Sequence, residues 1–237
     1  MDFSWYDTRR YPTLPVRDGY AAWAPTYERV VQDEMDLRLL ERLTTVRWSA
    51  ARRTLDLACG TGRIGRWLRR RGVARLDGID LTAEMLEQAH AKRLYDELQH
   101  GDMLATGLPS AAYDLLTLVL ADEHLAALPP LYREAARLCA SGGQLVIVGY
   151  HPHFLMLGIP THFDRADGQP VAIESHVHLL SDHVKAGHAS GWRLREMDEG
   201  VVDEAWLAKK PKWRRYAGHP VSFAMVWQSA GGAATEG

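Results

Sequence analysis

The sequence predicts a doubly wound α/β fold, in which a mostly parallel sheet carries helices on both faces. Short apolar segments alternate with helical patterns between residues 54 and 150, and this alternation is typical of a parallel sheet. Segment 113–120 (YDLLTLVL) is rich in apolar residues, as a central strand buried on both faces should be. The first apolar segment runs directly into a glycine-rich turn, LDLACGTGRIG at 55–65.

Five strands are expected in this alternating region. They are 54–58 (TLDLA), 75–80 (RLDGID), a third that ends in 98–102 (LQHGD), 113–120, and 144–150 (QLVIVGY).

Helices are expected between these strands and before the first of them. Apolar residues at helical spacing mark a helix over 33–46, and the segment 63–70 (RIGRWLRR) predicts a second. Thr82 can cap a third helix, whose inner face carries Met85. A fourth begins at the two prolines 129–130 and is stopped by SGG at 141–143.

The pattern changes after Tyr150. Residues 151–170 are rich in Pro, Gly and His, which favours a long loop or lid over a packed helix. A short helix over 181–191, a strand over 192–200 and a half-buried strand over 222–227 are expected to follow. We therefore expect one domain over 1–230, with a substrate-side insertion at 151–178, C-terminal elements at 179–230 and a disordered tail at 231–237.

Composition excludes several classes of protein. The chain has 237 residues, 46% of them apolar and 24% charged, with a net charge of −2, so no overall field favours nucleic acid or an anionic membrane. No apolar run approaches the roughly 20 residues of a membrane span, and the start lacks the apolar core of a signal peptide. Cys59 and Cys139 form no disulfide framework. A soluble, cytoplasmic protein is expected.

The glycine turn indicates a ligand, and an acid beside it indicates which kind. Gly60, Gly62 and Gly65 form the pattern G-x-G-x-x-G, which lets backbone approach a ligand closely at a helix N-terminus. Asp56 precedes the turn, and a carboxylate there would repel a pyrophosphate by several kcal/mol where solvation is poor. The same carboxylate would attract a cation, so S-adenosylmethionine, with its sulfonium and ammonium groups, is the adenosine cofactor that fits.

Further acids follow the next strands. Asp80 ends the second strand, 20 residues after Gly60, where a carboxylate can accept hydrogen bonds from both ribose hydroxyls. Asp102 ends the third strand and can meet the adenine amine, while Met85 and Met103 offer soft apolar surfaces to the ring. Carboxyl ends of consecutive parallel strands share one edge of the sheet, which is where such sheets bind ligands.

These motifs, in this order, resemble the class I S-adenosylmethionine-dependent methyltransferases of the small-molecule type. The resemblance is good over about residues 20–150, with a cofactor-binding core at 53–150. It implies the Rossmann-like fold of that family, with seven strands and an antiparallel last strand, and a small-molecule substrate. It assigns the methionine part of the cofactor to Asp56, Ala58, Gly60 and Gly62, the ribose to Asp80, the adenine to Leu81, Met85, Asp102 and Met103, and backbone contacts to Leu120.

The segment 19–28 (GYAAWAPTYE) is similar to the N-terminal lid of the same family, here placed at 1–32. Tyr20 and Tyr27 would close over the cofactor, and Trp23 would join them, although all three can equally be core residues on an aromatic helix face.

Histidines are the candidate bases. His124 follows the fourth strand, His151 the fifth, and His153 stands two residues further on, so each can reach a methyl group above the sheet edge. Each can equally form an ordinary backbone hydrogen bond. Pairs such as HPH at 151–153 have a spacing that metals use, but no thiolate or carboxylate pattern completes a site, and we expect no metal.

Three alternatives stay open. A nicotinamide-dependent oxidoreductase uses the same glycine pattern, although Asp56 argues against it. A non-catalytic cofactor-binding subunit would keep the same motifs. An RNA methyltransferase is suggested only by the basic segment 209–216 (KKPKWRRY), in which aromatic residues are interleaved; the net charge argues against nucleic acid. The acceptor atom (O, N, S or C) and the oligomeric state do not follow from the sequence.

Overall fold

A computed structural model describes residues 1–31 and 35–230. The tail expected at 231–237 lies outside the described residues, as do the last residue of the expected lid and the first two of the helix expected over 33–46.

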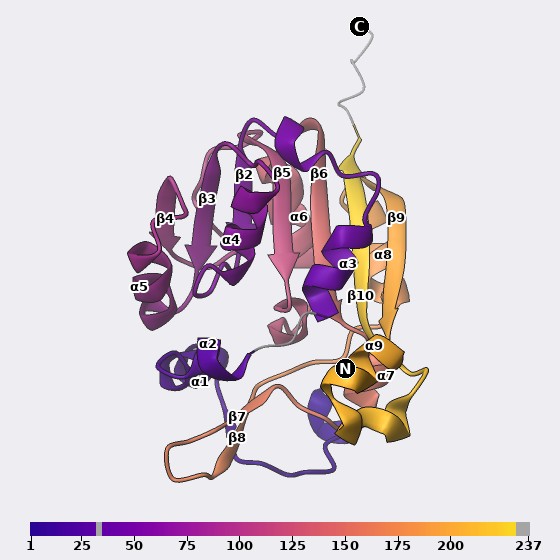
Figure 1. The fold of residues 1–237 in the computed structure, drawn as a ribbon. Coiled ribbons are helices and arrows are strands. Elements are labelled where there is room, and N and C mark those ends of the chain that lie inside the picture. The colour runs from indigo at the N-terminus through magenta and orange to yellow at the C-terminus, as the bar shows by residue number, and fades with distance from the viewer. Residues whose placement is uncertain (32–34, 231–237) are drawn as a thin grey trace, which may run out of the picture.

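The main sheet confirms the predicted fold class. Its seven strands lie in the order β4-β3-β2-β5-β6-β10-β9 (Figure 1). The last strand, β10, is antiparallel to both of its neighbours, whereas β2 to β6 pair in parallel. The strands are β2 (Thr54–Leu57), β3 (Leu76–Asp80), β4 (Glu97–His100), β5 (Tyr113–Val119), β6 (Cys139–Tyr150), β9 (Trp192–Val201) and β10 (Pro220–Ser229).

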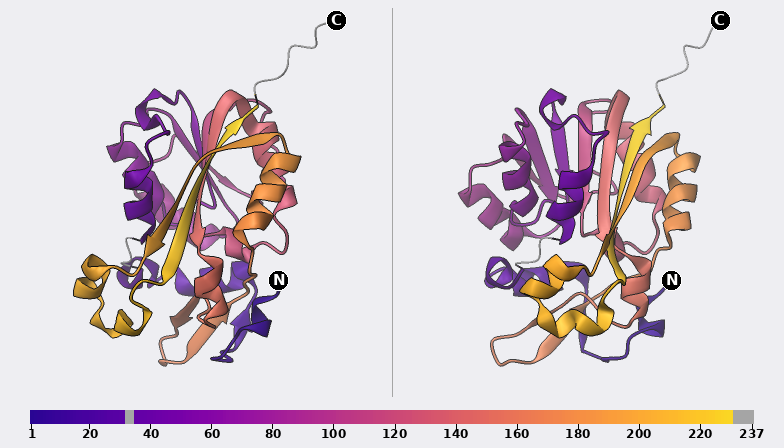
Figure 2. Two further views of the ribbon diagram at one scale, coloured as in Figure 1. Left: turned by 90° about the vertical axis from the view of Figure 1, so that its right-hand side faces the viewer. Right: turned by 45° about the vertical axis from the view of Figure 1, so that its right-hand side comes forward.

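Helices cover both faces of this sheet, as the two turned views show (Figure 2). One face packs on α6 (Pro129–Leu138) and α8 (Leu180–Ala189) through an apolar cluster that includes Leu131 and Trp227. The opposite face packs on α3 (Met35–Arg42) and α4 (Arg63–Arg70) through a second cluster that includes Leu39 and Trp67. Helix α5 (Ala83–Ala91) lies against β3 and β4 at the edge. The strands between these layers are buried on both sides, which explains their apolar sequences.

Two predicted boundaries differ from the structure. The fifth strand was expected from 144, but β6 begins at Cys139, which pairs with Tyr113 before the register shifts. The glycines at 142–143 therefore lie within a strand that has a bulge, instead of ending a helix. The third strand, β4, ends at His100, so Asp102 lies in the loop that follows.

A cap lies below the carboxyl ends of the parallel strands in Figure 1. The loop expected at 151–170 in fact contains α7 (Pro152–Met156), β7 (His162–Asp164) and the first residue of β8 (Pro170–Ile173). These strands form a small sheet with β1 (Thr13–Leu14), in the order β1-β8-β7. The partner strand comes from the other end of the chain, which is why a local pattern did not reveal this sheet.

The remaining elements belong to the cap or connect the layers. They are α1 (Val16–Trp23), α2 (Tyr27–Val30), α9 (Glu204–Lys209) and the 3₁₀ helices η1 (Phe3–Trp5), η2 (Trp48–Ala50), η3 (Asp122–His124) and η4 (Pro211–Tyr216). Among the helices described, none has the length and apolar content needed to cross a membrane.

Candidate functional site

A cavity of about 290 Å³ opens at the carboxyl edge of the sheet, between the parallel strands and the cap; we call it the donor cavity. Its walls come from the turns after β2, β3, β4 and β5 and from α1 and α2 of the cap. Ten of the thirteen residues predicted to bind a cofactor line it: Tyr20, Tyr27, Ala58, Gly60, Asp80, Leu81, Met85, Asp102, Met103 and Leu120.

The glycine turn presents its backbone to the donor cavity. Ala58 and Gly60 both have left-handed backbone conformations, with φ of +52° and +53°, which is costly for a residue with a side chain. A Cβ added to Gly60 would have no atom within 4 Å, so this glycine leaves open space beside the turn. That space is what close approach of a ligand to the backbone requires.

Asp80 joins the ends of two strands. One carboxylate oxygen accepts a hydrogen bond from the backbone N–H of Gly60 at 2.7 Å, and the other accepts one from the N–H of Thr82 at 2.8 Å. Burial raises the pKa of Asp80, and these hydrogen bonds partly oppose that increase. Each oxygen keeps a further lone pair, so the carboxylate fixes the glycine turn and can still accept hydrogen bonds from a ligand.

Asp56 occupies a different position from the one expected. Its carboxylate is 1% exposed and is absent from the cavity wall. The oxygens accept hydrogen bonds from the hydroxyls of Tyr95, at 2.7 Å, and Thr117, at 2.8 Å. Burial raises the pKa of Asp56 to about 6. Asp56 is therefore linked to the glycine motif through Tyr95, whose ring packs against Gly62 and Gly65.

Two further glycines of the motif make room for Tyr95. Gly62, at the N-terminus of α4, has φ of +83°, and a Cβ there would lie 3.0 Å from the Tyr95 ring. A Cβ at Gly65 would lie 2.4 Å from the Tyr95 hydroxyl oxygen. Gly62 does not line the donor cavity, in contrast to its expected contact. These glycines are needed for packing of the tyrosine that holds Asp56.

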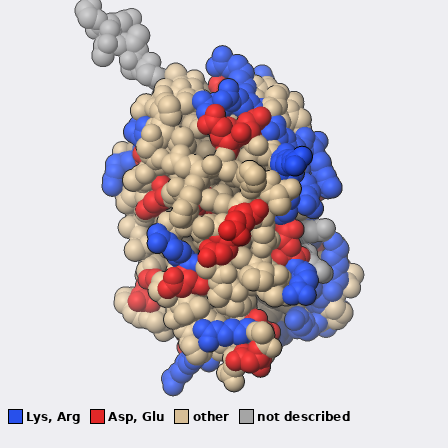
Figure 3. Space-filling view, turned by 90° about the vertical axis from the view of Figure 1, so that its left-hand side faces the viewer, with Lys and Arg blue, Asp and Glu red and all other residues tan. Residues whose placement is uncertain are grey.

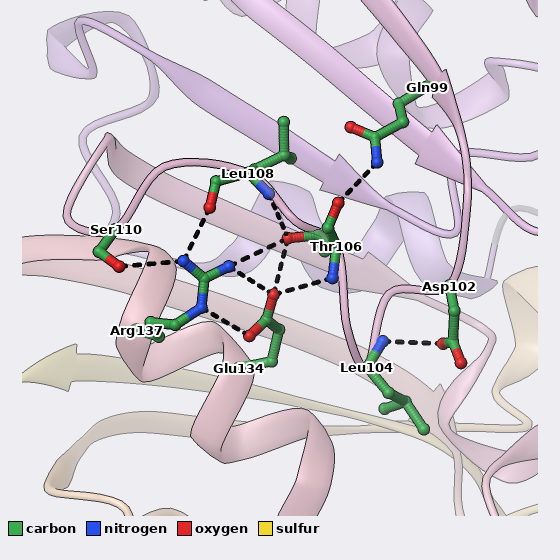
Figure 4. A network of polar contacts seen from close by, with 8 residues as sticks. All are labelled: Gln99, Asp102, Leu104, Thr106, Leu108, Ser110, Glu134 and Arg137. Carbon is green, nitrogen blue, oxygen red and sulfur yellow. Dashed lines mark hydrogen bonds and ion pairs between the residues drawn. The ribbon is translucent and has the colours of Figure 1, made fainter.

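The loop after β4 carries Asp102 and Met103 to the cavity, and a polar network fixes its continuation (Figure 4). Asp102 accepts a hydrogen bond from the N–H of Leu104 at 2.8 Å. Further along, Glu134 accepts bonds from both the N–H and the hydroxyl of Thr106, and Arg137 of the same helix donates two bonds to Glu134. The hydrogen bonds from Arg137 hold the pKa of Glu134 at about 2, so this anchor stays charged at neutral pH.

His124, of the three candidate bases, reaches the donor cavity. Its Nδ1 lies 2.7 Å from the backbone carbonyl of Glu174, and its Nε2 lies 2.8 Å from the hydroxyl of Tyr20. A carbonyl only accepts hydrogen bonds, so Nδ1 carries the proton in the neutral ring and Nε2 accepts from Tyr20. Burial lowers the pKa of His124 to about 4, well below the expected value of 6.5.

Comparisons with known proteins agree with this geometry. Residues 55–147 match the family model of a methyltransferase domain. The malonyl-[acyl-carrier protein] O-methyltransferase of Halorhodospira halophila is 30% identical over 194 residues, which are 79% of this chain and 61% of that protein. By this match, residues 55–147 are a methyltransferase domain, and the chain is similar to the class I S-adenosylmethionine-dependent methyltransferases.

Two further relatives extend the comparison. The demethylmenaquinone methyltransferase of Thermus thermophilus is 31% identical over 138 residues, 54% of this chain and 63% of that protein. The crystal structure of an S-adenosylmethionine-dependent methyltransferase from Mesorhizobium loti has a TM-score of 0.67 at 20% identity, over 83% of this chain and 98% of that chain. The chain thus spans less than two thirds of the length of the two curated relatives. S-adenosylmethionine is the methyl donor of this family.

The methyltransferase fold places the other two candidate bases elsewhere. His151 caps α7, where its Nδ1 accepts the N–H of His153 and its Nε2 lies 2.9 Å from Glu199. His153 lies 3.0 Å from His219. Neither histidine lines the donor cavity. The structure thus places both rings outside this cavity, because the chain turns into α7 directly after β6.

Trp23 also lies outside the donor cavity wall. Its ring stacks between Tyr20 and Phe163, with ring centroids 5.9 Å and 5.4 Å away, and it is 8% exposed. Trp23 instead lines a second cavity of about 410 Å³, which Leu120 borders as well as the first. We call it the aromatic cavity. The sequence did not predict it, because its walls come from segments far apart in the chain.

Sequence reasoning also missed Arg63 and Glu123. Arg63 lines the donor cavity and forms a buried ion pair with Asp36, which is fully buried. Glu123 is 1% exposed, with Oε1 3.4 Å from the Thr161 hydroxyl and 3.5 Å from Nε2 of His124. Burial next to Asp122 raises the pKa of Glu123 to about 8. The two neighbouring acids in ADEHL could have indicated Glu123, because buried acids at a strand end that faces a cavity often belong to functional sites.

Two further observations concern the histidine pairs and the basic segment of the sequence. Residues 1–31 and 35–230 contain no group of three or more His, Cys, Asp or Glu arranged to hold a metal ion. On the face shown in Figure 3, acidic side chains lie among the basic ones. In the basic segment 209–216, the Trp213 ring stacks on Phe154 at 5.5 Å, so one of its faces is already covered within the fold.

Proposed function

We propose that the protein transfers the methyl group of S-adenosylmethionine to a small-molecule acceptor. The hydrogen bond between Asp80 and the Gly60 backbone carries this proposal, because it holds an acid and an open glycine turn together at the edge of the donor cavity. Asp80 would accept hydrogen bonds from the ribose, as expected from its position after β3. Met85 and Met103 would contact the adenine.

The residues present fit this cofactor. Gly60 leaves space for it, and the donor cavity wall contains two acids, Asp80 and Asp102, next to apolar groups. Arg63, near the N-terminus of α4, is the cation that would face a carboxylate. A nicotinamide dinucleotide would use an acid at the position of Asp80 for its own adenosine ribose, so the similarity to methyltransferases is what favours S-adenosylmethionine over that cofactor.

When bound, S-adenosylmethionine supplies a methyl group on a cationic sulfur; the acceptor forms a bond to this carbon as the carbon–sulfur bond breaks, and the sulfur keeps the electron pair. The chain has to align the acceptor with the methyl group and exclude water, and alignment alone can supply about 7–11 kcal/mol. Tyr20 and Tyr27 of the cap would exclude water over the cavity. A proton leaves the acceptor only if it is a hydroxyl, thiol, amine or carbon acid. The two named relatives act on different acceptors, so their names do not select one for this chain.

Calorimetric titration with S-adenosylhomocysteine tests the proposal. We expect binding in the wild type and at least about tenfold weaker binding in Asp80→Asn, because the variant loses charge-assisted hydrogen bonds to the ribose. Glu84→Gln is the matched control, since Glu84 is exposed on the neighbouring helix and does not line the cavity. Equal affinity in wild type and Asp80→Asn would refute the assignment. Binding of NADH but not of S-adenosylhomocysteine would favour the oxidoreductase.

A further inference from the structure

The aromatic cavity adjoins the donor cavity and has the size of a ligand site. Its volume is about 410 Å³, within the range of about 300–1,000 Å³ found for small-molecule pockets. Leu120, directly after β5, borders both cavities and has a left-handed backbone, with φ of +55°. A molecule in the aromatic cavity therefore lies beside the end of β5, next to the proposed methyl donor.

Aromatic rings form the walls of this cavity, and they hold one another in place. Trp23 stacks on Phe163 with ring centroids 5.4 Å apart, and Phe154 stacks on Trp213 at 5.5 Å. Trp206 meets Trp213 edge to face at 5.6 Å. Rings that are already ordered lose little entropy when a ligand packs on them. Such walls favour an apolar body, and a flat ring system above all.

Few of the side chains that line the aromatic cavity are charged. Among its described lining residues, the side chains with a full charge are Lys212 and Asp164. Lys212 is exposed within η4, and Arg214 and Arg215 are exposed in the same short helix. Asp164 lies on β7, where its side chain is exposed. On the η4 side the charge that lines the cavity is thus that of Lys212, which favours a ligand with a negative charge there.

The wall next to the donor cavity offers a hydroxyl. Tyr150 ends β6 and lines the aromatic cavity, and its ring stacks on Phe154 at 5.7 Å. Its hydroxyl forms no hydrogen bond with another described residue. It is also not one of the fully buried polar atoms that lack a partner. The hydroxyl is therefore accessible and able to donate to, or accept from, a polar group on the acceptor.

We propose that the aromatic cavity is the acceptor site and that it takes an amphipathic anion, whose apolar ring-bearing body packs on the aromatic walls while its anionic group lies at Lys212. This inference rests on the proposed function, because it needs a methyl donor beside Leu120. The reacting atom would lie near Tyr150, at the opposite end of the molecule from the anionic group.

A pair of fluorescent probes tests the two parts of this inference, the apolar body on the aromatic walls and the anionic group at Lys212. The first is 8-anilino-1-naphthalenesulfonate, and the second is N-phenyl-1-naphthylamine, which has the same ring body without the sulfonate. Both are titrated into the full chain with saturating S-adenosylhomocysteine, so that the donor cavity is filled. Calorimetry of S-adenosylhomocysteine itself, in each variant, reports whether the protein is folded and whether the proposed function stands.

We expect one site for each probe, with the anionic probe bound about fivefold more tightly, as one partly exposed ion pair allows. Lys212→Met should remove this preference, whereas Lys185→Met, an exposed lysine on α8, should keep it. Trp213→Ala should weaken both probes by about tenfold, since it removes a wall ring. Ile159→Trp should weaken both as well, because the half-buried Ile159 lines the cavity and the larger ring would fill part of it. Trp48→Ala, at a half-buried ring that packs on Trp67 and does not line the cavity, should change neither.

Other results would overturn the inference. Equal affinity for the two probes in the wild type, or an unchanged preference in Lys212→Met, would show that no anionic group is recognised at Lys212. Probe binding that is unchanged in both Trp213→Ala and Ile159→Trp would place the probes outside the aromatic cavity. If S-adenosylhomocysteine binds in all of these variants, either result refutes the acceptor assignment alone. If it binds in none, including the wild type, the proposed function itself fails.

Discussion

The hydroxyl of Tyr20 lies 2.8 Å from Nε2 of His124, and this hydrogen bond joins the first helix of the cap to the end of β5. The rings also meet edge to face, with centroids 5.3 Å apart. Because Nδ1 donates to the carbonyl of Glu174, Nε2 is the only basic atom of the ring, and Tyr20 already occupies it. If the acceptor loses a proton to His124, that proton would therefore pass through the Tyr20 hydroxyl.

This pair predicts coupled effects on turnover. We expect Tyr20→Phe and His124→Asn each to lower kcat about 10²-fold if the acceptor is a hydroxyl. The double variant should be no slower than the slower single variant, because both changes break one relay. Affinity for S-adenosylhomocysteine should stay within a few-fold. Steady-state kinetics and calorimetry measure both. If each variant retains more than about a third of wild-type kcat, alignment alone carries the reaction.

Substitutions at two glycines of the motif should distinguish a loss of cofactor binding from a loss of folding. Gly60→Val should abolish binding of S-adenosylhomocysteine while the chain stays folded, because its Cβ meets no other atom but stands in the space beside the turn, where φ is +53°. Gly65→Val should prevent folding, because its Cβ would lie 2.4 Å from the Tyr95 hydroxyl oxygen. Circular dichroism and calorimetry distinguish these outcomes. A folded Gly65→Val protein would show that Tyr95 can move away from α4.

Glu123 should make the protein less stable as pH rises. The folded protein raises the pKa of this group from 4.5 to about 8, so between these values it binds more protons than the unfolded chain does. Its stabilising contribution is complete below pH 4.5 and is lost as pH rises through 8. Relative to Glu123→Gln, we expect the wild type to lose about 3 kcal/mol of unfolding free energy between about pH 6 and about pH 8.5. Urea unfolding of both proteins at the two pH values measures this. A constant difference would show that Glu123 ionises normally in the fold.

The ion pair between Arg63 and Asp36 should be costly to break. Arg63 is 21% exposed and Asp36 is fully buried, so Asp36→Asn would leave a largely buried cation without its partner. We expect a loss of about 3–5 kcal/mol of unfolding free energy. Glu41→Gln breaks an exposed ion pair, in which the Arg71 side chain is 41% exposed and the Glu41 side chain 54% exposed. This change should cost less than about 1 kcal/mol of unfolding free energy. Denaturant unfolding compares the two. Similar losses would mean that water reaches Arg63 freely.

The sequence by itself determined the class of fold and the donor side of the site. Strand–helix alternation predicted the sheet, and Gly60, Asp80, Met85 and Asp102 follow strands whose carboxyl ends must share one edge. These residues lie near one another because each is tied to the end of its own strand. Local patterns are sufficient in that case, since the periodicity of apolar residues fixes where strands end.

Only the tertiary structure decided the direction of Asp56, the choice among the histidines and the acceptor side. Asp56 and Gly60 are four residues apart, yet Gly60 lines the donor cavity while the Asp56 side chain is buried outside it, hydrogen-bonded to Tyr95 and Thr117. Of the three histidines that follow strand ends, only His124 lines the donor cavity, because the chain after β6 turns away into α7. The aromatic cavity brings together residues as distant as Trp23 and Trp213. Contacts between segments so far apart depend on how the cap packs on the sheet, and that packing leaves no periodic pattern in the sequence of either segment.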